Sequence, residues 1–143
     1  MDPLSLTASI IAVVTLASQV IKRCQSYLSA IKDAPGDFNN ILIEVGSMKC
    51  VLETLKLHVD VSGAFPDVTG INESVKGCET ALRDLLGLLP NHTSNSKKRK
   101  KDKFDTIQAD FKWPLKRAKA KRLLEEIGTS KSTISLVLTT DIQ

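Results

Sequence analysis

Aromatic residues are scarce in this chain, which has one Trp, one Tyr and four Phe among 143 residues. Glycine is sparse as well, at seven residues, whereas the small and aliphatic residues Leu, Ile, Val, Ala and Ser are abundant. Since β-sandwiches and barrels draw on aromatic strands joined by many turns, this composition favours helices. The hydrophobic share of 42% and the charged share of 25% are average for a soluble globular domain, and the length suits one domain.

Cysteine is also rare, and the three cysteines Cys24, Cys50 and Cys78 stand far apart without a C-x-x-C spacing. An odd number at these spacings does not suit a disulfide framework or a zinc site. We therefore expect all three thiols to be reduced and buried, in an intracellular protein.

The chain lacks the common signatures of catalysis. It contains no G-x-x-x-x-G-K-S/T phosphate loop, no G-x-S-x-G elbow and no H-E-x-x-H zinc motif. The two histidines, His58 and His92, lie in different segments and do not suggest a metal site. We expect no enzymatic activity, no metal, no cofactor and no small-molecule substrate.

What the chain does have is a regular apolar spacing. Along four stretches apolar residues recur at steps of three and four, as expected for helices with one buried face. The members are Leu6, Ile10, Val13, Ala17, Val20, Cys24, Tyr27 and Ile31; then Phe38, Ile41, Val45, Met48, Leu52, Leu55 and Val59; then Ile71, Val75, Cys78, Leu82, Leu85 and Leu89; and finally Ala120, Leu124, Ile127, Ile134 and Leu138. Lys131 stands in the last stretch where an apolar residue would fit.

Turn-forming residues at 33–37 and 62–67 and Pro90 separate these stretches. A further short helix is expected from Phe104 to Phe111, interrupted near Trp113-Pro114. The sequence therefore predicts an all-α fold, an antiparallel helical bundle of four long helices plus a short helix. We expect a single domain over residues 1–143, with a flexible basic loop at about 91–103.

The first stretch is unusual because no charged residue occurs from Pro3 to Ile21. Nineteen helical residues reach about 28 Å, just under the thickness of the hydrocarbon core of a membrane. However, six Ser, Thr and Gln residues make the stretch only modestly hydrophobic, and Asp2 stands where a signal peptide carries positive charge. We predict a core helix of the bundle, with insertion into a membrane on activation left open.

Charge is distributed unevenly. The net charge is +4, but residues 34–90 carry four basic and eight acidic groups, whereas residues 91–143 carry thirteen basic and six acidic groups. The basic residues fall mainly in two groups, at 97–103 and at 112–122. They are consistent with a solvated surface, a nuclear import signal at 97–100, or contact with anionic lipid. Nucleic acid is not expected as a partner, because no aromatic residues alternate with the basic ones.

The stretch MDPLSLTASIIAVVTLASQVI, the KDAP turn at 32–35 and the closing W-P-L-K…L-L-E-E-I…K-S…L-V-L-T-T-D at 113–141 resemble a known family. They are similar to the N-terminal HeLo-like domain of fungal NLR-like STAND receptors. The resemblance implies a cell-death effector domain, followed in a longer receptor by a nucleotide-binding domain and repeats. It also implies that the receptor oligomerises and that the N-terminal helix, here Pro3 to Ile21, permeabilises the plasma membrane. The basic insert at 97–103 has no counterpart in the family pattern.

Together these observations predict a cytoplasmic domain that reaches the plasma membrane on activation, with anionic lipids and homologous domains as its partners. The inserting face is expected to be Leu6, Ile10, Val13, Ala17 and Val20. The residues expected to contact anionic lipid are Lys97, Lys98, Arg99, Lys100, Lys101, Lys116, Arg117, Lys119, Lys121 and Arg122. The alternatives are a protein-interaction or signalling module without membrane activity, and a nuclear protein addressed by residues 97–100.

Overall fold

The computed structural model describes residues 3–30, 36–62, 68–89 and 99–142, and within them the side chains of 6–29, 36–61, 70–89 and 116–139. This part of the chain forms four helices and no strand: α1 (Pro3–Ala30), α2 (Asp37–Ser62), α3 (Val68–Leu88) and α4 (Arg99–Ile142). The predicted all-α helical bundle is confirmed.

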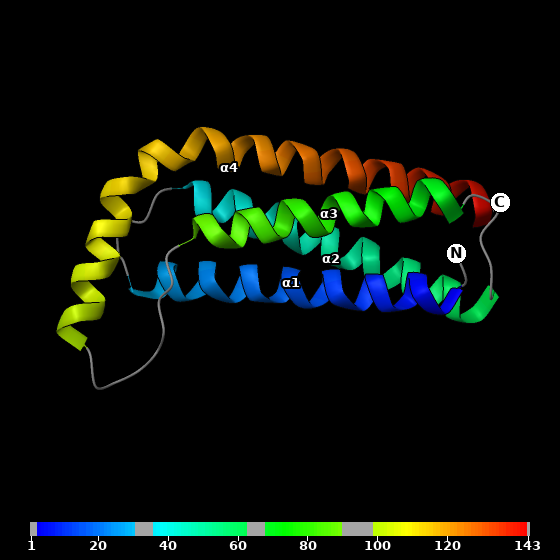
Figure 1. Cartoon of the computed structure of the whole chain (residues 1–143), viewed down its shortest axis with the longest axis horizontal. Coiled ribbons are helices and arrows are strands. Elements are labelled where there is room, and N and C mark those ends of the chain that lie inside the picture. The colour runs from blue at the N-terminus through cyan, green and yellow to red at the C-terminus, as the bar shows by residue number, and fades with distance from the viewer. Residues whose placement is uncertain (1–2, 31–35, 63–67, 90–98, 143) are drawn as a thin grey trace.

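The four helices form two antiparallel hairpins that lie side by side (Figure 1). Helix α1 packs against α2 and α3, and α4 packs against the same two helices. Consequently α1 and α3 are neighbours that run in the same direction, as are α2 and α4, while α2 and α3 face each other across the diagonal.

The apolar spacing read from the sequence forms the core. Every described member of the first three stretches is buried, and Ile31 lies outside the described residues. The fourth stretch differs in one position, because Leu123 is 4% exposed whereas Leu124 is only partly buried. Leu123 lies three residues after Ala120 and four before Ile127, which keeps it on the buried side of α4.

Two side-chain contacts in the core join α2 to α1 and to α3. The rings of Tyr27 in α1 and Phe38 in α2 stack with their centroids 4.4 Å apart, and both side chains are fully buried. Across the diagonal, Cys78 Sγ of α3 lies 3.7 Å from Met48 Sδ of α2. Aromatic stacking and polarizable sulfur atoms add specific geometry to packing that is otherwise aliphatic.

The predicted short helix is wrong as a separate element, because it is continuous with the fourth long helix. Helix α4 has 44 residues and passes through Trp113-Pro114 without a break. Figure 1 shows that it bends instead: its first part crosses the end of the bundle, and the rest lies along it. A proline inside a helix removes one amide donor and crowds the preceding turn, which kinks the helix.

The basic loop predicted at about 91–103 overlaps the start of this helix. Residues Arg99 to Lys103 belong to α4, and residues 90–98 lie outside the described part of the chain.

Lys131, which interrupts the apolar spacing of α4, pairs with Glu44 of α2. Its Nζ lies 2.9 Å from Glu44 Oε1, and the two side chains are 25% and 28% exposed. That oxygen makes no hydrogen bond with any described residue, so the contact is an ion pair without hydrogen-bond geometry. A Cβ at Gly128 would lie 3.3 Å from the same oxygen. Glycine therefore makes room for the carboxylate, although it weakens a helix by about 1 kcal/mol relative to alanine.

Two adjacent isoleucines of α1 allow a matched test of this packing. Ile10 is fully buried and Ile11 is 49% exposed. We expect Ile10→Ala to lower the free energy of unfolding by about 2–5 kcal/mol, because it removes buried methyl groups and leaves a cavity. Ile11→Ala should change it by less than about 1 kcal/mol. Urea denaturation followed by circular dichroism measures both; equal losses would contradict the assigned face of α1.

Candidate functional site

The residues predicted to enter a membrane lie in the core of the resting bundle. Leu6, Ile10, Val13, Ala17 and Val20 are between 0% and 1% exposed, packed toward α2 and α3. Within the described residues α1 contains the one stretch, Leu6–Ser29, that is long and apolar enough to cross a membrane, a test that the core helix of a soluble protein also passes. Burying the four larger side chains of this face contributes roughly 6–12 kcal/mol.

The polar contacts of α1 with other helices are confined to its C-terminal part. Arg23 Nη1 donates a hydrogen bond of 2.9 Å to the carbonyl oxygen of Leu86 in α3. By contrast, the described side chains from Leu6 to Ile21 make no hydrogen bond or ion pair with another helix. Apolar packing alone therefore holds that part of α1 in place.

A second basic side chain reaches the same end of α3. Lys116 of α4 donates a hydrogen bond of 3.3 Å to the carbonyl oxygen of Leu88. The last carbonyl groups of a helix have no partner within the helix and carry partial negative charge, so cations are favourable there. Arg23 from α1 and Lys116 from α4 thus donate hydrogen bonds to carbonyl groups at the C-terminal end of α3.

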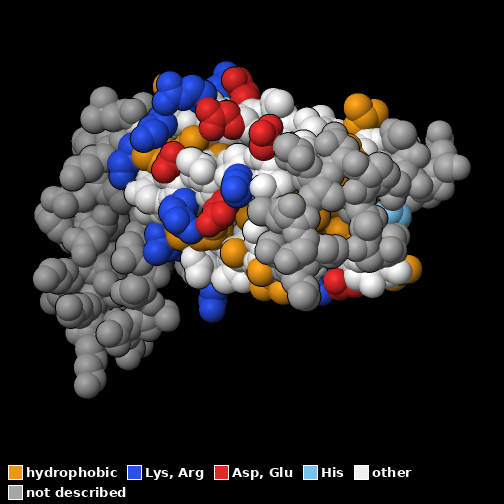
Figure 2. Space-filling view, turned by 45° about the vertical axis from the view of Figure 1, so that its right-hand side comes forward, with side chains coloured by type: hydrophobic (Ala, Val, Ile, Leu, Met, Phe, Trp, Pro, Cys, Tyr) orange, Lys and Arg blue, Asp and Glu red, His pale blue; other side chains and the backbone are white. Residues whose placement is uncertain are grey.

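The basic residues predicted to contact lipid fall into three sets. Lys97 and Lys98 lie outside the described residues, and for Arg99, Lys100 and Lys101 the structure describes only the backbone at the start of α4. Lys116 and Arg117 make contacts within the bundle, whereas three side chains are exposed and have no partner among the described residues: Lys119, Lys121 and Arg122. Figure 2 shows Lys and Arg side chains gathered at the left of the bundle, beside the part of the surface drawn in grey.

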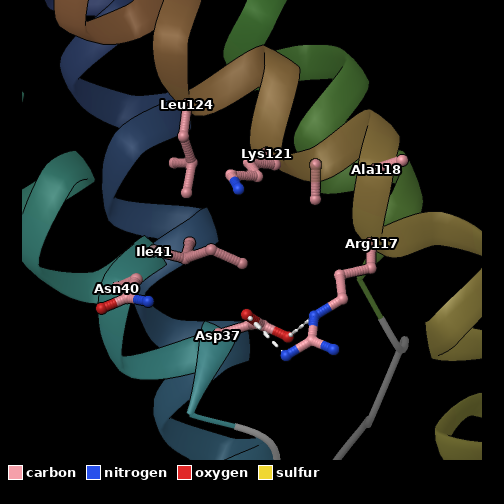
Figure 3. Close-up of a pocket in the computed structure, with 8 residues that line it drawn as sticks. Asp37, Asn40, Ile41, Arg117, Ala118, Lys121 and Leu124 are labelled. Atoms are coloured by element: carbon pink, nitrogen blue, oxygen red, sulfur yellow. Dashed lines mark hydrogen bonds and ion pairs between the residues drawn. The ribbon is translucent and has the colours of Figure 1, made fainter.

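An open groove lies between the start of α2 and the part of α4 from Arg117 to Leu124 (Figure 3). It has a volume of about 540 Å³, within the range of small-molecule sites. The side chains that line it are Asp37, Asn40 and Ile41 from α2, and Arg117, Ala118, Ala120, Lys121 and Leu124 from α4. The sequence did not predict this groove, because residues that face each other across it, such as Asp37 and Arg117, are 80 positions apart in the chain.

An ion pair closes one end of the groove. Arg117 Nε lies 2.7 Å from Asp37 Oδ2, and Arg117 Nη2 lies 3.4 Å from Asp37 Oδ1. This two-point contact holds α4 against the start of α2 and fixes the guanidinium plane. Of the two cations that line the groove, Lys121 is the one without such a partner in the described structure.

The chain was compared with models of known protein families. A family model described as "Pigment biosynthesis cluster protein PigL N-terminal" (PigL_N) matches residues 1–142. The chain belongs to the PigL_N family. This fungal family is related to HeLo-like domains, which agrees with the resemblance seen in the sequence at the level of the domain. No curated protein and no solved structure gives a match.

The PigL_N chain also exposes an apolar stripe on α2. Ile43, Leu57 and Val61 are 69%, 65% and 79% exposed, and Cys50 is exposed as well. Ile43, Cys50 and Leu57 are spaced by seven residues, which places them along one line of the helix, opposite the core. Sequence reasoning missed this stripe, although the seven-residue spacing was a signal that could have revealed it.

The prediction that all three cysteines are buried is wrong for Cys50. The other two thiols are buried. Burial raises the pKa of Cys24 to about 12, and it raises the pKa of Cys78 to about 11 despite a hydrogen bond with Ser130 that lowers it. A thiol that stays protonated and inaccessible reacts slowly, since the thiolate is the nucleophile.

Within the described part of the PigL_N chain, no group of three or more His, Cys, Asp and Glu side chains converges on a point that could hold a metal ion.

The three thiols are expected to differ in reactivity. At pH 8 a maleimide should modify the native chain once, at Cys50, and all three cysteines should react in urea. Intact-mass spectrometry measures the number of adducts, and Cys50→Ser should abolish the fast adduct. Rapid modification of Cys24 or Cys78 in the native state would show that the core opens more readily than this packing allows.

Proposed function

We propose that this PigL_N domain is a non-enzymatic, membrane-permeabilising effector of regulated cell death, the N-terminal part of a fungal NLR-like STAND receptor. In the resting state it is cytoplasmic and α1 is packed in the bundle. On activation the receptor oligomerises, α1 leaves the bundle, and its apolar face enters the plasma membrane. Anionic lipids and homologous domains are the partners.

The uncharged length of α1, held only by apolar packing, is the observation that carries this proposal. From Pro3 to Ile21 the helix has no charged residue on any side, so the whole stretch can enter hydrocarbon without burying a charge. In water, exposing the core face costs roughly 6–12 kcal/mol for its four larger side chains. Lipid tails are as apolar as the core, so a membrane offsets this cost. Release of α1 therefore needs an apolar environment to receive its core face. For this reason α1 leaves the bundle only when it can insert into a membrane.

The exposed side of α1 allows insertion to be tested without disturbing the core. Ile11→Asp places a charge at a position that is 49% exposed in the bundle, so the domain should still fold. In the middle of an inserted helix, the same charge costs about 2.5–3.5 kcal/mol. We expect Ile11→Asp to reduce dye release from anionic liposomes by at least about tenfold, which a free energy of about 1.4 kcal/mol already produces.

Leu136→Asp in α4 is the matched control, because Leu136 is 68% exposed and the substitution introduces the same charge outside α1. Circular dichroism melts confirm that both variants fold. Dye release that falls equally in the two variants, or in neither, would exclude α1 as the inserting element.

A second candidate function is a protein-interaction module without membrane activity, favoured by the exposed stripe on α2. Ile43 and Leu57 stand seven residues before and after Cys50. In an antiparallel pairing of two copies centred on Cys50, Ile43 of each copy therefore meets Leu57 of the other. Such an interface is isologous, the commonest arrangement in homodimers. It is one helix wide and is expected to be weak, since stable interfaces bury about 1,200 Å² or more.

This second function predicts a specific covalent dimer. Mild oxidation should link two chains through Cys50, and Leu57→Asp should lower the yield severalfold because it places charge in the contact. Leu136→Asp should leave the yield unchanged, and Cys50→Ser should remove the dimer. Non-reducing gels give the yields and analytical ultracentrifugation gives the association without oxidant; a chain that stays monomeric in both would exclude this interface.

A further inference from the structure

We propose that the groove between α2 and α4 binds the phosphate of an anionic phospholipid headgroup. The inference rests on the proposed function in that it assumes the domain meets a membrane. It assigns a specific site within the broad set of basic residues, and it separates Lys121 from the neighbouring cations of α4.

The groove combines an apolar floor with polar walls. Ile41 and Ala120 are 1% and 3% exposed, and the partly buried Leu124 continues the apolar surface. Lys121 stands on the α4 wall and the amide of Asn40 on the α2 wall (Figure 3). A phospholipid has the matching order of groups, with a phosphate joined to glycerol and then to acyl chains. A soluble anion would leave uncovered the apolar surface that the exposed Ala118 and the partly buried Leu124 contribute to the groove.

Lys121 supplies the charge that the ligand requires. Its side chain points into the groove from α4 (Figure 3), and it has no hydrogen bond or ion pair in the described part of the chain. Asp37, Arg117 and Lys121 together give the groove a net charge of +1. An ammonium group has three donors and accepts phosphate oxygens without a fixed orientation.

Arg117 acts as a positioning residue. Asp37 occupies its Nε and Nη2 groups, which neutralises the carboxylate that would otherwise repel a phosphate. A guanidinium has five N–H donors, so others remain for a ligand oxygen. The pair thus keeps the two walls of the groove together and keeps its negative charge away from the phosphate.

The location of the groove fits a membrane-facing end of the bundle. It lies where α2 begins and α4 bends, at the end opposite the N-terminus of α1 (Figure 1). The first part of α4, with its basic sequence from Arg99 to Lys103, lies at the same end. Headgroup binding in the groove would hold this end of the bundle at the membrane. The N-terminal half of α1, which only apolar packing retains, would then lie away from the bound headgroup.

The experiment measures binding of the folded domain to phosphatidylcholine vesicles that contain phosphatidic acid, using flotation or surface plasmon resonance. Lys121→Ala tests the cation in the groove. Lys119→Ala is its matched control, since Lys119 is exposed on the same helix but does not line the groove. Ala118→Leu narrows the groove at an exposed position without changing the charge. Thermal melts establish that each variant is folded.

We expect Lys121→Ala and Ala118→Leu to weaken vesicle binding by at least about tenfold. Lys119→Ala should weaken it by no more than about fivefold, the share of one lysine in general attraction to an anionic surface. Equal losses for Lys121→Ala and Lys119→Ala, or no loss for Ala118→Leu, would overturn the site. Inorganic phosphate that binds through Lys121 and displaces nothing from vesicles would mark a soluble phosphate site and overturn the lipid assignment.

The outcomes separate this site from the proposed function. If the groove fails, dye release that depends on Ile11 remains. If dye release does not depend on Ile11, the comparison of Lys121→Ala with Lys119→Ala still reports on headgroup binding.

Discussion

The apolar face of α1 is the surface on which the rest of the bundle depends. Leu6 to Val20 fill the space between α2 and α3, and no described polar contact supports them there. The packing that completes the core is therefore also what retains this part of α1 in the bundle. Because the hydrophobic effect has no preferred direction, this face is equally satisfied by protein or by lipid.

Three of the described polar and aromatic contacts between helices lie near the C-terminal end of α1. The stack of Tyr27 on Phe38, the bond from Arg23 to Leu86 and the pair of Arg117 with Asp37 all lie where α1 and α3 end, α2 begins and α4 bends. Charge-assisted bonds and aromatic stacking require defined geometry, in contrast to aliphatic packing. Helix α1 is thus tied to its neighbours by specific contacts near its C-terminal end and by apolar packing from Leu6 to Ile21, whereas Lys131 and Glu44 join α4 to α2 farther along the bundle.

This asymmetry connects the site to the proposed membrane activity. The groove with Lys121, the cations of α4 and the fixed contacts share one end of the bundle. The uncharged part of α1 extends away from that end. Under the proposed function, release of α1 would leave in place the contacts that hold α2, α3 and α4 together, since α3 and α4 pack on each other and α2 packs on α4.

The sequence alone predicts the first three helices and, except at Leu123 of α4, the buried faces, because a step of three or four residues places apolar side chains on one side of a helix wherever that helix packs. It also revealed the uncharged length of α1. The packing of the helices determines that α2 and α3 lie across the diagonal and that α4 continues through Pro114 as one bent helix (Figure 1). It also decided that Arg117 meets Asp37, a contact between residues 80 positions apart. Local spacing carries no information on which helices become neighbours. The groove exists only because α2 and α4 pack side by side.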